Sequence, residues 1–249
     1  MSSVVLITGA SGGIGREAAI QCAAKGAHVA VHYGRNRDNA EQTLSQLSGD
    51  GHRLFQADIS SPENTQTLIQ SVVREMGALT VLVNNAGISQ RQEISEIDFD
   101  TWQDCWQRIV TTNLTAAANL TFLACQHMKD NGGGRVVNVS SRGAFRGEPN
   151  MPWYGASKAG MNAMGQSMAQ AFAPHNVYVY TVAPGFVETD MAAKVLASPE
   201  GQNIRSQSPA GRVAQPAELG NTISYLAMDA PAFMTGCIVD VNGASYLRS

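Results

Sequence analysis

Tyr154 and Lys158 are the two residues whose types and spacing most clearly suggest chemistry. They stand four positions apart at the start of an expected helix, Tyr154–Phe172, so they share one helical face about one turn apart. A free tyrosine has a pKa of about 10, and a nearby ammonium group can lower that pKa by about one to three units. The pair therefore suits acid–base chemistry, in which the phenol gives a proton to a carbonyl oxygen or takes one from a hydroxyl group.

Ser141 follows an expected strand, Arg135–Ser140, and comes shortly before Tyr154. Its hydroxyl group could hold the same substrate oxygen. Taken alone, Tyr154 fits an amphipathic core tyrosine better than a catalytic one. The combination of Tyr154 with Lys158 and Ser141 favours a catalytic site.

A glycine-rich loop joins the first expected strand, Val4–Thr8, to the first expected helix, Ile14–Lys25. In its T-G-x-x-x-G-x-G spacing, Gly9 allows the turn, Gly13 lets the backbone approach a pyrophosphate, and Gly15 lets helix and strand pack closely. The helix N-terminus adds unpaired N–H groups and about +0.5 of a charge. A glycine-rich turn without a ligand is the alternative, but the position between strand and helix favours a dinucleotide site. The predicted contacts in this loop are Gly9, Ser11, Gly13, Ile14 and Gly15.

The end of the second expected strand bears on the choice of dinucleotide. NAD sites favour an acid about 20 residues after the glycine loop, and the stretch His32–Arg37 contains none. Arg35 could bind a 2′-phosphate bidentately, so we expect NADP(H) rather than NAD(H). Alternatively, Arg35 and Arg37 are ordinary solvated charges. Asp58, after the third expected strand, would accept a hydrogen bond from the adenine amino group.

Short β-branched runs alternate with longer amphipathic stretches along the whole chain. The runs are nearly continuous in apolar residues, as in strands covered by helices on both faces. The alternation predicts an α/β fold: a single-domain Rossmann fold over residues 1–249, with a doubly wound, seven-stranded parallel sheet flanked by helices. The other expected strands are 29–33, 53–57, 80–84, 177–182 and 238–241, and the other expected helices are 39–47, 62–76, 99–109, 112–129 and 216–228.

The composition excludes several classes of protein. Of 249 residues, 44% are apolar and 15% charged, which rules out a mostly disordered chain. A net charge of −3 and a pI of about 5.9 argue against a nucleic-acid partner. The apolar stretches are shorter than the roughly 18 residues of a membrane helix, and the N-terminus does not resemble a signal peptide. The 4 scattered cysteines lack metal-ligand spacing, so we expect a cytoplasmic protein without a metal site.

With these motifs in place, the chain resembles a short-chain dehydrogenase/reductase over essentially its whole length. The order of the motifs along the chain makes the resemblance specific. They are Thr8–Gly15, Asp58-Ile59, Asn84-Asn85-Ala86-Gly87, Asn113, Ser140-Ser141, Tyr154–Lys158 and Pro184–Thr189.

The resemblance implies roles that spacing alone does not give. Asn113 should interrupt its helix and hold a water that passes protons toward Lys158, which should also bind the nicotinamide ribose. Asn85, Ala86 and Gly87 should line the adenosine-ribose side, as part of a cofactor site that also takes in Tyr154, Asp58 and Ile59. The residues that should cradle the nicotinamide and the pyrophosphate are Pro184, Gly185, Val187 and Thr189.

Within this family the chain is most similar to the 3-oxoacyl-[acyl-carrier-protein] reductases, because Ala183–Met191 and Pro209–Arg212 look like theirs. Two departures stand out. Gly12 occupies a position where NADP-binding members often carry a basic residue. Gly132 and His175 stand where those reductases present basic residues to an acidic carrier protein, so such docking should be weak. The resemblance therefore supports the chemistry better than the substrate.

The residues around the site suit a small or medium carbonyl compound. Arg142 and Arg146 could select an anionic substrate, or they could be structural or solvent-facing. The segment 189–212 resembles a lid that orders over bound ligands. Candidate pocket residues are Ser89, Arg91, Arg142, Phe145, Trp153, Phe186, Met191 and Val195.

Two of the expected helices, 112–129 and 154–172, carry apolar or small residues around much of their circumference, which indicates burial on more than one side. In the family these helices pair across a two-fold axis, so we expect a homo-oligomer, a dimer or a tetramer. A deep monomer core is the alternative.

The leading hypothesis is an NADP(H)-dependent oxidoreductase that interconverts a carbonyl and a secondary alcohol. Its substrate would be a 3-oxoacyl thioester or, alternatively, a small ketone, sugar or polyol. A non-catalytic dinucleotide-binding regulator would not need Asn113, Ser141, Tyr154 and Lys158 together. An epimerase or dehydratase of the extended type usually carries an added C-terminal domain, for which 249 residues leave no room.

Overall fold

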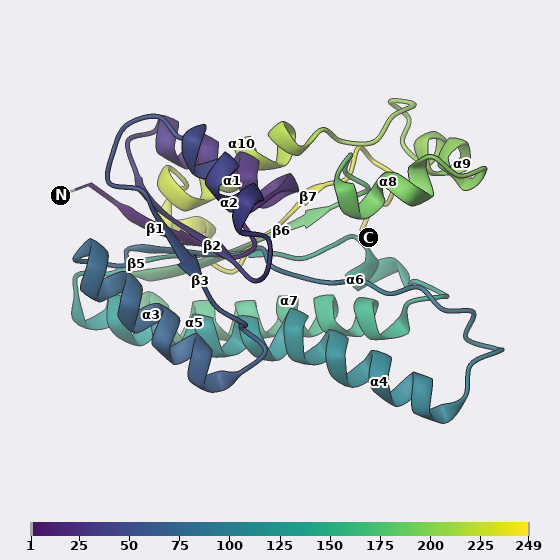
Figure 1. Cartoon of the computed structure of the whole chain (residues 1–249), viewed down its shortest axis with the longest axis horizontal. Helices are drawn as coiled ribbons and strands as arrows, with labels where there is room; N and C mark the ends of the chain where they lie inside the picture. The colour runs from purple at the N-terminus through teal and green to yellow at the C-terminus, as the bar shows by residue number, and fades with distance from the viewer. Residues whose placement is uncertain (1, 249) are drawn as a thin grey trace.

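The seven expected strands all form, and in a computed structural model of the chain they align in one parallel sheet (Figure 1). The structure describes residues 2–248; Met1 and Ser249, the ends of the expected domain, lie outside the described residues. The sheet order is β3-β2-β1-β4-β5-β6-β7. The strands are β1 (Val4–Ile7), β2 (His28–Tyr33), β3 (Arg53–Gln56), β4 (Val81–Asn84), β5 (Gly134–Val139), β6 (Val177–Pro184) and β7 (Ile238–Val241).

Helices connect the strands and cover both faces of the sheet (Figure 1). The α-helices are α1 (Gly13–Ala24), α2 (Arg37–Ser45), α3 (Pro62–Met76), α4 (Phe99–Val110), α5 (Ala116–Asp130), α6 (Gly143–Arg146), α7 (Pro152–Phe172), α8 (Asp190–Leu196), α9 (Glu200–Ser206) and α10 (Pro216–Met228). Local signals set several of the helix ends. The Ser61 side chain accepts a hydrogen bond from Asn64 N and caps α3, and Gly77 ends it in the left-handed conformation.

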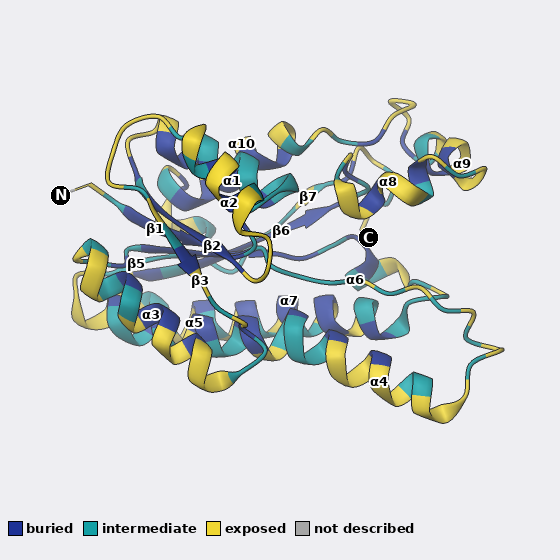
Figure 2. Ribbon diagram, viewed as in Figure 1, coloured by how far each residue is buried: buried dark blue, intermediate teal, exposed yellow. Residues whose placement is uncertain are grey.

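Two apolar layers hold the sheet between the helices. One layer joins the sheet to α1 and α10 through residues such as Ala19, Cys22 and Ile223. The other joins it to α3, α5 and α7 and includes Leu68 and Leu120. The inner strands of the sheet and the inward faces of these helices are buried, whereas the outward helix faces and much of the edge strands β3 and β7 are exposed or half-buried (Figure 2). This arrangement confirms the doubly wound α/β fold.

The strand order reverses between β1 and β4, and in such sheets ligands bind outside the carboxyl ends of the strands at this point. The glycine loop follows β1, and Asn85–Gly87 follows β4. Ser141 follows β5, and Gly185 follows β6. The fold thus brings motifs that are far apart in the sequence to one edge of the sheet.

Two segments differ from the sequence prediction. The first residues of the expected helix 112–129 form the π-helical turn Thr111–Thr115, and α5 begins only at Ala116. The segment 189–212, in which no helix was predicted, forms the short helices α8 and α9 around a small apolar cluster that includes Leu196 and Ile204. Within residues 2–248, every helix is too short or too polar to span a membrane.

Candidate functional site

A cleft of about 1400 Å³ runs along the carboxyl edge of the sheet. Almost all of the predicted cofactor and catalytic residues line it. They are Gly9, Ser11, Gly13, Ile14, Arg35, Asp58, Ile59, Asn85, Ala86, Gly87, Ser141, Tyr154, Lys158, Pro184, Gly185, Val187 and Thr189. Gly15 and Asn113 lie behind the cleft wall, where they are buried.

The glycine loop forms a cradle that side chains would fill. A Cβ at Gly15 would come within 2.4 Å of the Gly9 carbonyl oxygen and 2.5 Å of Asn85 Nδ2. Gly9 and Gly13 adopt φ angles of 64° and 53°, which disfavour other residues. α1 begins here, and its N-cap residue, Gly12, has no side chain that could cap the helix. The open backbone N–H groups and the missing side chains fit the pyrophosphate of a dinucleotide.

Neutral side chains help to hold the glycine loop in place. Asn85 Nδ2 donates to the carbonyl oxygens of Thr8 and Gly9, at 2.9 and 3.1 Å. Thr8 Oγ1 accepts from the backbone N–H groups of Asn85 and Ala86, both at 3.0 Å. Asn85 therefore holds the loop in addition to lining the cleft.

His32 on β2 also holds the loop, and sequence reasoning did not single it out. Its Nδ1 accepts from Gly9 N at 3.1 Å, and its Nε2 lies 3.1 Å from the Ala57 carbonyl oxygen. Because Nδ1 accepts, the neutral ring carries its proton on Nε2 and donates it to Ala57. Burial lowers the pKa of His32 to about 4, so the ring is neutral at pH 7. The sequence signal that could have identified His32 was a polar residue among the apolar residues of a buried strand.

Arg35 and Asp58 stand at the far end of the cleft, at the ends of β2 and β3. Asp58 Oδ1 accepts hydrogen bonds from Ser60 N at 3.0 Å and Ser60 Oγ at 2.7 Å. These bonds, with a smaller contribution from Arg35, lower the pKa of the Asp58 carboxyl group. Arg37 has turned away into α2, where its Nε donates to Glu41 at 2.8 Å. Of Arg35 and Arg37, Arg35 is therefore the one that lines the cleft.

Ser141, Tyr154 and Lys158 meet on the opposite wall of the cleft. The Lys158 ammonium group is buried, lies 5.9 Å from the centre of the Tyr154 ring, and donates to the Val139 carbonyl oxygen at 2.8 Å. Burial lowers the pKa of Lys158 to about 8. Ser141 Oγ accepts from Gly143 N at 3.0 Å, and its interaction with the Tyr154 phenol favours the ionised form of that phenol.

The pKa of Tyr154 differs in direction from the sequence expectation. Lys158 was expected to lower it, but burial of the phenol raises it, and the negative charge of Glu148 adds to the rise. The physical reason is that desolvation of the phenolate is the largest contribution. Tyr154 is consequently the protonated phenol at pH 7, which is the form that donates a proton to a carbonyl oxygen.

Asn113 occupies the middle of the π-helical turn. Its Oδ1 accepts from Ile88 N at 2.8 Å, and its Nδ2 donates to the Ile88 carbonyl oxygen at 2.9 Å. The helix is interrupted here, as the family resemblance implied. A Cβ at Gly87 would lie 3.3 Å from Asn113 Oδ1 and 3.5 Å from Lys158 Nζ, so these two side chains face a common space beside Gly87.

Comparison with known proteins decides the family. A family model described as short chain dehydrogenase matches residues 3–200. The chain belongs to the short-chain dehydrogenase family. It is 33% identical to a 3-oxoacyl-[acyl-carrier-protein] reductase FabG of Staphylococcus aureus, over 99% of both chains. It is 34% identical to the protein of that name from Vibrio cholerae, over 98% of this chain and 97% of the relative.

A solved structure shares the fold of this short-chain dehydrogenase. It is described as a putative gluconate dehydrogenase from Agrobacterium tumefaciens, and it superposes with a TM-score of 0.90 at 28% identity. The match covers 98% of this chain and 95% of that one. The two kinds of relative act, by their names, on different substrates.

The substrate side of this dehydrogenase differs from prediction at two positions. Trp153 was expected in the pocket, but it is fully buried, and its Nε1 donates to the Gln90 carbonyl oxygen at 2.9 Å. Phe145 is also absent from the cleft lining, because its ring packs under the Arg248 guanidinium group at 4.6 Å. The expected residues that do line the cleft are Ser89, Arg91, Arg142, Phe186, Met191 and Val195.

Glu148 lines the cleft and was missed by sequence reasoning. It lies in the irregular segment between Ser141 and Tyr154, close enough to both for its charge to affect the phenol. The available signal was a carboxylate between the two candidate catalytic residues Ser141 and Tyr154.

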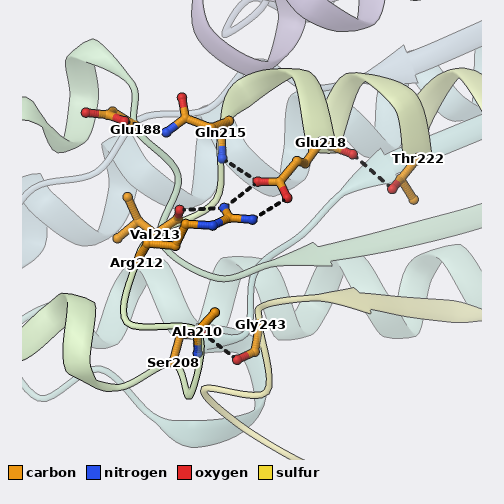
Figure 3. Close-up of polar contacts among 9 residues, drawn as sticks. All are labelled: Glu188, Ser208, Ala210, Arg212, Val213, Gln215, Glu218, Thr222 and Gly243. Carbon is orange, nitrogen blue, oxygen red and sulfur yellow. Dashed lines mark hydrogen bonds and ion pairs between the residues drawn. The ribbon is translucent and has the colours of Figure 1, made fainter.

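The segment 189–212 is fixed at its C-terminal end (Figure 3). Arg212 Nη1 and Nη2 each lie 2.8 Å from an oxygen of Glu218 on α10. Gln215 N donates to the same carboxylate at 2.8 Å, and these hydrogen bonds lower the pKa of Glu218 to about 2. Within the segment, Glu200 on α9 pairs with Arg91 at 2.7 Å. The segment is thus tied to α10 through Arg212 and to the cleft residue Arg91 through Glu200.

Proposed function

We propose that this short-chain dehydrogenase interconverts a carbonyl and a secondary alcohol by NADP(H)-dependent hydride transfer. The observation that carries the proposal is that Ser141, Tyr154 and Lys158 share one wall of a cleft whose other end is the glycine loop. The cradle at Gly9, Gly13 and Gly15 supports a bound dinucleotide.

The side chains then have distinct roles. A bound nicotinamide would supply the hydride in reduction. Tyr154 donates its phenolic proton to the carbonyl oxygen, and Ser141 holds that oxygen. Lys158 binds the nicotinamide ribose and, with a pKa of about 8, provides positive charge beside the tyrosinate that remains. A water in the space shared by Asn113 and Lys158 relays the replacement proton.

NADP(H) is the proposed dinucleotide because Arg35 is exposed, faces the cleft and has no acidic residue beside it in sequence. Its guanidinium group can bind the 2′-phosphate in the bidentate geometry that arginine favours. The segment 189–212 is proposed as the lid over the substrate.

Two substrate classes have support. The relatives from Staphylococcus and Vibrio suggest a 3-oxoacyl thioester. The structural neighbour suggests a sugar acid or related polyol, and the uncharged Gly132 and exposed His175 weaken docking of an acidic carrier protein. Both substrates undergo the same chemistry at Tyr154.

The test is NADPH consumption with an acetoacetyl thioester and with small keto sugars, beside the variant Tyr154→Phe. General acid catalysis contributes about 10²- to 10⁴-fold, so turnover should fall by that factor while NADPH affinity stays unchanged. Equal turnover by wild type and variant would exclude Tyr154 as the acid.

We also propose a homo-oligomer. Phe99 and Trp106 on α4 and Phe122 on α5 are large apolar side chains that this single chain leaves exposed. Burial of such side chains favours self-association. Light scattering on the purified protein measures the mass, and a mass of 26.4 kDa would contradict the proposal.

A further inference from the structure

Arg142 is a buried charge on which the carboxylate of Glu148 acts only from a distance. Its residue is only 3% exposed, yet it lines the cleft directly after Ser141. Its Nη2 donates to Gln207 Oε1 at 2.5 Å, and its guanidinium group stacks over the Phe186 ring at 5.1 Å. Within residues 2–248, no carboxylate oxygen lies within 4.0 Å of it.

Burial of the Arg142 charge costs free energy unless a ligand supplies an opposite charge. A buried charge loses its hydration and is normally paired with an opposite charge. Burial and the nearby Arg146 lower the pKa of Arg142, and the negative charge of Glu148 offsets this only in part. An amide oxygen satisfies one donor of Arg142 but not its charge. The guanidinium group is therefore prepared for an anion that enters the cleft.

Glu148 provides the complementary group. Its side chain is 18% exposed and lines the same part of the cleft. The nearest cation is Arg146, whose Nε is 4.0 Å from Glu148 Oε1, beyond hydrogen-bond distance. A carboxylate in this state accepts hydrogen bonds from hydroxyl groups. An acyl chain offers no such donor.

From this pair we infer that the cleft selects small substrates that carry both a carboxylate and hydroxyl groups. Arg142 binds the carboxylate, and Glu148 accepts a hydrogen bond from a hydroxyl group beside the reacting carbon. The inference rests on the proposed function and specifies its substrate class as hydroxy acids of the sugar-acid type. A dinucleotide phosphate is the other anion that Arg142 could bind.

The reaction would be the oxidation of one secondary alcohol of the substrate. Tyr154, which is protonated before the reaction, first loses its phenolic proton to solvent through the water beside Asn113 and Lys158. The C–H bond of the substrate then breaks and its hydride passes to NADP⁺, while the hydroxyl proton passes to the tyrosinate. The products are the keto acid, NADPH and one proton. The carboxylate of the substrate takes no part and serves only for binding.

Matched substrates separate this inference from its alternatives. D-gluconate and D-sorbitol differ in that a carboxylate replaces a terminal CH₂OH group. Wild-type protein should oxidise gluconate with NADP⁺ at least tenfold more efficiently than sorbitol, measured as kcat/KM. Calorimetric titration of the protein with NADP⁺ present should show binding of gluconate and much weaker binding of sorbitol.

Variants assign the discrimination to Arg142. Arg142→Met should raise KM for gluconate at least tenfold more than KM for sorbitol and leave the Kd of NADPH unchanged; Arg142→Lys should restore part of the loss. Arg146→Met is the comparison variant, because Arg146 also donates to Gln207 Oε1, at 3.2 Å, but does not line the cleft; since it lies 4.0 Å from Glu148, it should affect gluconate and sorbitol equally. Glu148→Gln should raise KM for both polyols, whereas with an acetoacetyl thioester its effect should be confined to kcat, through the pKa of Tyr154.

Four results would overturn the inference while leaving the proposed function intact. The first three are equal efficiency with gluconate and sorbitol, an acetoacetyl thioester as the better substrate with Arg142→Met unaffected, and a raised NADPH Kd in Arg142→Met, which would assign Arg142 to a cofactor phosphate. The fourth is failure of the protein to bind gluconate in the titration, which needs no turnover assay. Retained turnover in Tyr154→Phe would instead reject the proposed function.

Discussion

On the dinucleotide side of the cleft, hydrogen bonds to backbone groups hold the glycine loop, most of them from neutral side chains, whereas charged side chains line the substrate side. Asn85 and His32 fix the glycine loop through hydrogen bonds of 2.9 to 3.1 Å. The substrate side depends on Arg142, Glu148 and the pair between Arg91 and Glu200.

The two sides of the cleft should respond differently to substitution. Neutral hydrogen bonds in a packed loop require one geometry, so substitutions there should disturb binding of the dinucleotide as a whole. Charges that face a cleft are rearranged or paired by whatever ligand enters, so substitutions there should alter which substrate binds. Variants on the two sides therefore test the comparison, and the largest effects belong to the dinucleotide side.

Gly15→Ala should have the largest effect. The new Cβ would overlap the Gly9 carbonyl oxygen at 2.4 Å, and overpacking against a backbone costs about 3 kcal/mol. The expected result is at least a 100-fold rise in the NADPH Kd, or an equivalent loss of folding stability, measured by fluorescence titration and urea unfolding. Gly12→Ala is the control, because its Cβ meets nothing within 4 Å. Unchanged NADPH binding together with unchanged stability in Gly15→Ala would contradict this account of the loop.

His32 should make the dinucleotide side sensitive to acid. Its pKa is about 4 in the folded chain against 6.5 in the unfolded chain, so below pH 6.5 the unfolded state binds the extra proton. The free energy of unfolding should thus fall as the pH drops from 6.5 and level off below about pH 4, with about 2 kcal/mol lost by pH 5.

Urea unfolding of wild type and His32→Gln at pH 6.5 and pH 5 measures this contribution, since the variant should lack it. The pH dependence of unfolding that comes from other groups, such as Asp58, is common to both proteins and cancels when their free energies of unfolding are compared. His175→Gln, at an exposed histidine, should behave as wild type. The same pH dependence in all three proteins would contradict the role of His32.

Most of the fold was predictable from the sequence because strand and helix signals agree along the chain. The predicted ends of the β-branched runs lie within two residues of the observed strand ends, since polar or turn-forming residues follow most of the runs. The helices α8 and α9 were not predicted. They are short, rich in small residues, and stabilised by packing of Leu196 against Ile204 rather than by a local signal.

The candidate site was predictable where a motif demands one backbone geometry, as at Gly13 and Tyr154. It was not predictable where tertiary contacts decide. Trp153 is beside Tyr154 in sequence, yet it points into the core and packs against Trp102 with ring centres 5.6 Å apart. The direction of the pKa shift of Tyr154 also depends on burial, which cannot be predicted from residue spacing.

Arg35→Met should sharpen the comparison at the outer end of the dinucleotide side. Loss of one charge-assisted contact to the 2′-phosphate should raise the NADPH Kd about tenfold and leave the NADH Kd unchanged, which corresponds to about 1.4 kcal/mol. Arg37→Met is the matched control, because Glu41 already binds that arginine at 2.8 Å. A wild-type preference for NADH would contradict the assignment of NADP(H).

The smallest effect should come from Glu200→Gln, on the substrate side. The pair between Arg91 and Glu200 has side chains that are 53% and 55% exposed, and such pairs contribute about 0 to 1 kcal/mol. Urea unfolding should show a loss of about 0.5 kcal/mol or less, and KM should change about twofold at low salt and not at all near 1 M salt, where the screening length is about 3 Å. Glu218→Gln should cost more, since Glu218 binds both Arg212 and Gln215 N and anchors the end of the same segment. If Glu200→Gln were instead the more damaging change, the exposed pair would be a structural clamp, and the substrate side would be built as rigidly as the glycine loop.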